Sequence, residues 1–342
     1  MKNTLSRFPT ISVVIPIYNE EKNLIRLFNS LKKQKYGGNI EYIVVDDGST
    51  DNSGKLAKEF GARVIKVETH DIELNKGIGM HKANGEYVYW LDADMEVCST
   101  DFFKKLAEPL RKDNKIVGSF TKEFALDGCK QSNYSSLLRF ISYHPLQQDP
   151  LYAFFSAKIE NQIIEKRENY TICKFNPGKI PAVGRILYRR KKLLGTSVGK
   201  NKSFIDMEAV EIVTRAGNDL FAYVPSAKIR HYHAETLGDL IKKRLRNLER
   251  DYLPNYENKY FTWFNTKDPK DIVKILFWVS WANLFVPETI RGIYKMFKYK
   301  DIVFLWQPIV AITTTDAILW GFLSKAKGRR IAQSLFMNLI KK

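Results

Sequence analysis

Two carboxylates of this 342-residue chain are spaced one residue apart at the end of an apolar run. Asp92-Ala93-Asp94 directly follows Tyr87–Leu91. Such a pair can hold a hard divalent cation, Mg²⁺ or Mn²⁺, and through it the diphosphate of a nucleotide, whose negative charge the cation offsets. Acidic triplets also occur as solvated turns, and that alternative stays open for the triplet taken alone. Its place behind an apolar run favours a ligand site.

Two other segments carry side chains that could contact a nucleobase. Asp47 follows an apolar run, and its carboxylate could accept a hydrogen bond from a base imide N–H. Tyr18 follows another such run and could stack on the base. Both segments also have purely structural interpretations, with Asp47-Gly48 as a turn, Asp51 as a helix cap, and Asn19 as the cap of the next helix.

The elements that position these residues alternate between short apolar runs and helical patterns. Strands are predicted at Ile11–Ile17, Glu41–Val45, Arg63–Val67 and Tyr87–Leu91, with a helix at Glu20–Lys33 between the first two. This alternation predicts βαβ units and a doubly wound α/β fold with a mostly parallel sheet. Ligands bind at the carboxyl ends of the strands of such sheets, which is where the acidic residues stand.

Three strings, in their order and spacing, resemble glycosyltransferase family 2. They are Val13–Glu21, Val44–Asp51 and Gly85–Asp94, and the resemblance extends over about residues 10 to 250. It implies a GT-A fold and transfer of a sugar, with inversion at the sugar carbon, from a nucleotide-sugar donor that is UDP-, GDP- or dTDP-linked. It also implies a divalent cation, Mg²⁺ or Mn²⁺.

The resemblance assigns roles to the matching residues. Those expected to bind the nucleotide-sugar are Pro16, Tyr18, Glu20, Asp47, Lys76, Asp92 and Ala93. Those expected to hold the metal are Asp94, as the more direct ligand, Asp92 and His231. His233, two residues further along, is the alternative to His231. The helix that carries Lys76 is shorter than usual for the family, and His81 or Lys82 could replace Lys76 in meeting the donor.

The general base is expected at Asp206. An inverting transfer needs one carboxylate to take the proton of the acceptor hydroxyl, and the family has this residue at the start of a late helix. Asp206 precedes Ala216-Gly217 by the family's usual distance, although Ile205 stands where the family often has Glu. Glu208 is the alternative base, and a role for Asp206 as helix cap also stays open.

A basic helix is predicted at Leu237–Tyr252, whose cations could face a diphosphate, lipid phosphates or only solvent. The Gln-x-x-Arg-Trp signature of processive synthases is missing, so addition of a single sugar is expected. The net charge of +18 favours acidic partners. No nucleic-acid recognition motif accompanies that charge, and nucleic acid is not an expected partner.

The organisation expected from these patterns has three segments. Residues 1–115 form the nucleotide-sugar-binding half, 116–262 the acceptor-binding half with the base, and 263–342 a membrane-associated helical tail. The tail holds two apolar stretches, Ile272–Ile290 and Ile302–Leu323, each interrupted by polar residues or proline and flanked by Lys and Arg. We expect them to lie in the cytoplasmic face of the cell membrane, near a lipid-linked or polysaccharide acceptor; packing on the catalytic domain is the alternative.

The remaining composition adds little constraint. Three widely spaced cysteines favour a reducing compartment over a disulfide framework, and residues 1–10 show no secretory pattern. Two rival functions are a sugar-nucleotide pyrophosphorylase, whose Gly-rich phosphate loop is replaced here by Tyr18–Glu21, and an inactive membrane scaffold, which the acidic residues argue against.

Overall fold

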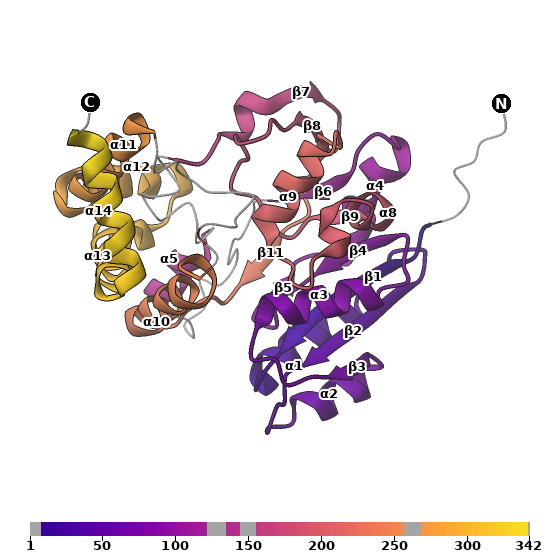
Figure 1. Cartoon of the computed structure of the whole chain (residues 1–342). Helices are drawn as coiled ribbons and strands as arrows, with labels where there is room; N and C mark the ends of the chain where they lie inside the picture. Colours follow the sequence, from indigo (N-terminus) through magenta and orange to yellow (C-terminus); the bar gives the residue numbers. More distant parts are fainter. Residues whose placement is uncertain (1–7, 122–134, 144–154, 255, 257–267, 341–342) are drawn as a thin grey trace. The chain divides into compact units, whose positions relative to one another are not determined.

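The computed structural model describes residues 8–121, 135–143, 155–254, 256 and 268–340 (Figure 1). The chain forms two compact units, Met1–Phe124 with Ala157–His231, and Ala125–Ser156 with Tyr232–Lys342. The chain therefore leaves the first unit and returns to it, and the expected middle segment 116–262 is divided between both units.

The first unit is built on a nine-stranded sheet in the order β3-β2-β1-β4-β9-β6-β10-β8-β7 (Figure 1). Its strands are β1 (Ile11–Ile17), β2 (Ile40–Asp46), β3 (Arg63–Lys66), β4 (Tyr87–Trp90), β6 (Gly118–Phe120), β7 (Ile163–Lys166), β8 (Thr171–Lys174), β9 (Leu187–Arg189) and β10 (Leu220–Tyr223). Strands β1 to β4 are parallel to one another, as predicted. Beyond β4 the sheet is mixed, because β9 runs antiparallel to both β4 and β6.

Burial explains why the first strands read as unbroken apolar runs. Every residue of β1 and β4 is buried, since helices cover both faces of a parallel sheet. The chain continues from β4 through Leu91, whose N–H donates to the carbonyl of Val14 in β1 over 2.9 Å. The acidic triplet therefore begins at the carboxyl edge of the sheet, beside the end of β1.

Helices α1 (Glu21–Lys32), α2 (Ser53–Phe60), α3 (Ile72–Lys82), α4 (Phe102–Lys112) and α9 (Asp206–Arg215) pack around this sheet. The buried face of α1, which includes Leu24, Leu27 and Leu31, joins the core beneath β1. The predicted helix at Glu20–Lys33 is thus confirmed. Gly217 directly after α9 has a φ of 80°, the left-handed conformation expected of a residue that ends a helix.

A short second sheet joins distant parts of the first unit. Strand β5 (Met95–Val97) pairs antiparallel with β11 (Ile229–His231), and Met95 stands opposite His231. The two strands lie far apart in the sequence. This pairing brings His231 next to the acidic triplet.

The second unit is helical in its described residues. It contains α5 (Ser136–Ser142), α10 (Leu237–Asn247), α11 (Pro269–Asn283), α12 (Val286–Tyr299), α13 (Gln307–Ser324) and α14 (Ala326–Ile340). The apolar stretch Ile272–Ile290 is not one helix, because α11 ends before the Leu284-Phe285 corner. By length and composition, Ile302–Ser324 could cross a membrane, but half of its most apolar window is buried inside the structure.

Candidate active site

The loops after β1 and β2 are joined by hydrogen bonds at the carboxyl edge of the sheet. Asn19, with a φ of 53°, accepts a hydrogen bond from the N–H of Thr50 over 2.8 Å, and its own N–H donates to Ser49 Oγ over 3.0 Å. The N–H of Glu20 donates to Ser53 Oγ over 2.8 Å. These bonds fix the backbone that directly follows Tyr18.

The predicted nucleobase residues of these loops differ in accessibility. Tyr18 is 54% exposed and is free to present its ring to a ligand. Pro16 is buried in β1, and the carboxylate of Glu20 accepts a hydrogen bond from Asn23 Nδ2 over 2.7 Å. Of these three side chains, the ring of Tyr18 is the most available for stacking.

Asp47 is a buried anchor for the loop that leads into α3. Its Oδ1 accepts hydrogen bonds from the N–H groups of Thr69 and His70 over 2.7 and 3.1 Å, and its Oδ2 accepts one from Asn75 Nδ2 over 2.9 Å. Burial alone would raise the pKa of Asp47, but these hydrogen bonds outweigh burial and lower the pKa. The carboxylate is thus held ionised beside the helix that carries Lys76.

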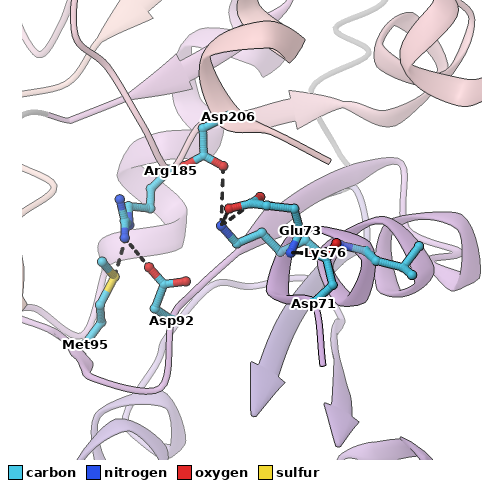
Figure 2. Close-up of polar contacts among 8 residues, drawn as sticks. Asp71, Glu73, Lys76, Asp92, Met95, Arg185 and Asp206 are labelled. Atoms are coloured by element: carbon cyan, nitrogen blue, oxygen red, sulfur yellow. Dashed lines mark hydrogen bonds and ion pairs between the residues drawn. The ribbon is translucent and has the colours of Figure 1, made fainter. Parts of the chain in front are cut away.

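The central cluster gathers charged side chains from four parts of the first unit (Figure 2). Lys76 of α3 lies 3.2 Å from Glu73 Oε1 and 3.8 Å from Asp206 Oδ1, at the start of α9. Arg185, which precedes β9, pairs with Asp92 Oδ2 and donates through Nε to Met95 Sδ. Two cations and three carboxylates therefore share one site.

The opposite charges of this cluster offset the cost of keeping buried groups ionised. Burial would lower the pKa of Lys76, but the carboxylates of Asp206, Glu73 and Asp92 outweigh it and raise the pKa well above its ordinary value. Burial would likewise raise the pKa of Asp92, but Arg185 and Lys76 outweigh it and lower the pKa. Lys76 and Asp92 are therefore both ionised at neutral pH.

Two buried carboxylate oxygens of the cluster are available to a ligand. Among the described residues, no hydrogen bond reaches Asp92 Oδ1 or Asp206 Oδ1. Buried acceptors are normally satisfied, so these two atoms indicate that a cation or a substrate hydroxyl completes the site.

Asp94 and His231 form the candidate metal pair. His231 Nε2 lies 3.3 Å from Asp94 Oδ1, and both side chains are largely buried. An imidazole nitrogen and a carboxylate oxygen are ligands that Mn²⁺ accepts, so Asp94 and His231 fit a divalent cation. The neighbour of this pair along the chain, His233, belongs to the second unit.

A close backbone contact sets the position of Asp206 relative to Lys76. A Cβ atom on Gly77 would stand 1.9 Å from the carbonyl oxygen of Lys202, so only glycine fits there. Two residues further on, the N–H of Phe204 donates to the carbonyl of Glu73 over 2.8 Å. The segment before α9 is thereby held directly on α3, and Asp206 follows it.

The structure gathers most of the predicted residues at one edge of the sheet. Lys76, rather than His81 or Lys82, lies in the charged cluster, because His81 contacts the Asn201 carbonyl and Lys82 is exposed. The side chain of Ala93 is packed in the apolar core, which leaves its backbone for any ligand contact.

The sequence did not identify Arg185 or Glu73 as residues of the site. Arg185 stands just before the basic run Arg189–Lys192, and nothing in the sequence distinguishes this arginine from the basic residues that follow it. Glu73 lies one helical turn before Lys76, a spacing typical of an ion pair on a helix. That spacing was a usable signal.

Comparison with known proteins gives an independent line of evidence. Residues 12–168 match the family model of glycosyl transferase family 2. The glycosyltransferase GlyG of Streptococcus pneumoniae is 35% identical over 127 residues, which cover 34% of this chain and 41% of that relative. The undecaprenyl-phosphate 4-deoxy-4-formamido-L-arabinose transferase of Proteus mirabilis is 36% identical over 104 residues, which cover 28% of this chain and 32% of that relative.

Solved structures are also similar over most of the chain. Among them is the mannosyltransferase PcManGT of Pyrobaculum calidifontis in complex with GDP-Man and Mn²⁺, with a TM-score of 0.49 and 12% identity, covering 98% of this chain and 88% of that one. The chain matches less than half the length of the two curated relatives described above.

Proposed function

Because this chain belongs to glycosyl transferase family 2, we propose that it moves a single sugar from a nucleotide-sugar donor to a hydroxyl of a lipid-linked or polysaccharide acceptor, with inversion at the sugar carbon. The observation that carries the proposal is the charged cluster, in which the candidate base Asp206 lies 3.8 Å from the buried cation Lys76. A proton acceptor and positive charge for a departing diphosphate thus stand in one site.

Asp206 is the proposed general base. Its Oδ1 is buried and accepts no hydrogen bond from the described residues, so it is available to an acceptor hydroxyl. As the acceptor oxygen forms its bond to the sugar carbon, Asp206 takes the hydroxyl proton, and the bond between that carbon and the diphosphate oxygen breaks. A single displacement of this kind needs no nucleophilic side chain and gives inversion.

Lys76 and Arg185 are the proposed positive charges on the leaving-group side. Both are buried and paired with carboxylates, so they are fixed in place before the donor binds. Asp94, His231 and Asp92 would hold a divalent cation, which supplies Lewis-acid stabilisation of the leaving diphosphate when bound. Arg185 orients Asp92 through one carboxylate oxygen and leaves the other oxygen for the cation.

The nucleobase is proposed to lie between the loops after β1 and β2. The exposed ring of Tyr18 supports stacking on the base. The hydrogen bonds around Asn19 support the idea that the two loops already hold their positions before the base binds. Asp47 is the proposed acceptor for a base N–H, in addition to its contacts with the loop before α3.

We propose a lipid-linked or polysaccharide acceptor, met at the cytoplasmic face of the cell membrane. The name of the Proteus mirabilis relative states a lipid phosphate, undecaprenyl-phosphate, and this supports a lipid-linked acceptor in envelope synthesis for the present chain. The missing Gln-x-x-Arg-Trp signature supports addition of one sugar. The basic, apolar tail supports work at the cytoplasmic face of the membrane.

A donor panel tests the proposal. The full chain is mixed with UDP-, GDP- and dTDP-sugars in the presence and absence of Mn²⁺ or Mg²⁺, and thermal stabilisation and release of nucleoside diphosphate are measured. We expect one nucleotide class to stabilise the protein in a metal-dependent way, and release to require Asp206. If no donor stabilises the protein with either metal, the proposed function is wrong.

A further inference from the structure

Helix α12 of the second unit buries polar side chains and exposes apolar ones, which is the reverse of a typical surface helix of a water-soluble protein. Its inward side carries Glu288, Arg291 and Lys295, and Glu288 is fully buried. A surface helix normally buries its apolar stripe and exposes its charges. The reverse arrangement indicates that the outer side of α12 is adapted to an apolar environment.

The inward side of α12 is stabilised by a polar network. Glu288 accepts hydrogen bonds from Trp281 Nε1 over 2.8 Å and from Gln307 Nε2 over 2.6 Å, and Arg291 Nη1 lies 3.2 Å from Glu288 Oε2. Lys295 donates to Gln307 Oε1 over 3.0 Å. These bonds link α12 to α11 and α13 and fix which side of α12 faces inward.

The outward side is a continuous apolar stripe. It consists of Val286, Ile290, Ile293, Tyr294 and Phe297, here called the α12 stripe. Their exposure runs from 39% for Ile293 to 73% for Phe297. Residues spaced by three and four positions share one side of a helix, so these side chains form one surface rather than scattered exposures.

The corner before α12 extends this surface. Leu284 and Phe285 are 64% and 48% exposed, and Phe285 adopts a φ of 60°. A bulky residue other than glycine rarely occupies this conformation, which here turns two apolar side chains outward at the junction of α11 and α12. The corner and the α12 stripe therefore present a contiguous run of chain, residues 284–297, with apolar side chains on its outer surface.

Exposed basic residues follow the stripe on α12 and also occur on the neighbouring helix in sequence, α11. Lys298 and Lys300 follow it on the exposed end of α12, and Lys270 and Lys274 are exposed on α11. Residues 268–340 contain ten Lys and Arg against five Asp and Glu. A second copy of this chain would bring like charges together at such a surface, whereas anionic lipid headgroups would neutralise them.

We propose that the α12 stripe and the Leu284-Phe285 corner insert into the interface of an anionic lipid bilayer, with the flanking lysines on the headgroups. The apolar side chains gain the burial that they lack in water, and the helix lies along the membrane rather than across it. The proposal rests on the proposed function only for its purpose, which is to keep the active site at the surface where a lipid-linked acceptor lies.

Vesicle co-sedimentation tests this surface with the full chain. One set of vesicles contains phosphatidylcholine and phosphatidylglycerol, and the other contains phosphatidylcholine alone. The stripe variant carries Ile290→Gln and Phe297→Gln, and the matched control carries Ile25→Gln and Ile164→Gln, two apolar side chains of the first unit that are 51% and 58% exposed. Both variants replace two exposed apolar side chains by glutamine, so neither should unfold the protein.

We expect the wild type and the control to bind the mixed vesicles. The stripe variant should partition roughly tenfold less for each substituted side chain, which is about a hundredfold for the pair. Lys298→Gln with Lys300→Gln should reduce binding to the mixed vesicles by roughly fivefold per lysine and change binding to neutral vesicles little.

Several outcomes would overturn the proposal. The first is a wild type that does not bind the mixed vesicles, and the second is a stripe variant that binds them as well as the control does. The third is a wild type that forms an oligomer and a stripe variant that is monomeric but binds vesicles equally well. Donor-induced thermal stabilisation, measured without vesicles, should be equal in the stripe variant and the control. A wild type that binds vesicles but no donor would therefore refute the proposed function without contradicting the proposed membrane-binding surface.

Discussion

Asp206→Asn separates the proposed base from the residues that bind the donor. Asparagine has nearly the same shape as aspartate but cannot take a proton from the acceptor. Lys76 Nζ lies 3.8 Å from Asp206, beyond hydrogen-bond distance, but only 3.2 and 3.3 Å from the two oxygens of Glu73. Lys76 therefore keeps its hydrogen-bonded partner in the variant, and the rest of the cluster should stay in place.

The expected effect falls on turnover. Loss of a general base slows transfer by about 10²- to 10⁴-fold, which corresponds to about 3 to 5 kcal/mol of activation free energy. Donor affinity should change by about 1 kcal/mol or less, and in the direction of tighter binding, because a negative charge near the donor diphosphate is removed. Steady-state release of nucleoside diphosphate gives the first quantity, and calorimetric donor titration gives the second.

Glu208→Gln is the matched comparison. It makes the same chemical change two residues further along α9, at the alternative base. Turnover by Asp206→Asn at the wild-type rate, or loss of turnover only in Glu208→Gln, would refute the assignment. A loss of donor affinity as large as the loss of turnover in Asp206→Asn would show that the carboxylate acts in binding rather than in proton transfer.

Three further perturbations test other parts of the structure. Asp94→Ala should weaken donor binding roughly tenfold or more when Mn²⁺ is present and little when it is absent, as donor calorimetry under both conditions would measure. Asp47→Asn should lower the free energy of unfolding by about 1 to 3 kcal/mol at neutral pH. Because the pKa of Asp47 is lowered in the folded state, the carboxylate contributes its full stability above its ordinary pKa of 3.8 and loses it as pH falls below that value. The free energies of unfolding of the two proteins, measured in urea, should therefore converge in acid. Burial, followed by the charge of Arg291, lowers the pKa of Lys295 to about 6, so the unfolded chain binds more protons than the folded chain between that pH and about 10. The second unit should therefore gain stability as pH rises through this range. Lys295→Met should flatten the pH dependence of hydrogen exchange in α12, and an unchanged profile would contradict the burial of this amine.

The first half of the sheet could be predicted from sequence because its signals are local. Strands β1 and β4 are fully buried and the second half of β2 is buried, and a polar residue stands within two positions of the end of each of these strands. The three family strings lie in this region, and the GT-A fold that they imply is confirmed by the family match and the sheet order.

The second half could not be predicted because its contacts are distant in sequence. Strand β9 inserts antiparallel between β4 and β6, and the three-residue strand β5 carries too little pattern to be recognised. Arg185 joins the site only because β9 lies beside β4, which places it against a carboxylate 93 positions earlier in the chain. The charge of Arg185 could be read from the sequence, but its partner could not.

The contact between Gly77 and the Lys202 carbonyl has a thermodynamic consequence. The backbone of Gly77 in α3 contacts the backbone of Lys202 with no side chain between them, so a displacement of α3 should directly displace the segment before α9. Lys76 would respond to the donor, and Asp206 would respond to the acceptor. We therefore expect the affinities for the two substrates to depend on each other, and by linkage each must alter the other's affinity by the same factor. An ordered or synergistic binding scheme would follow from the absence of a single methyl group.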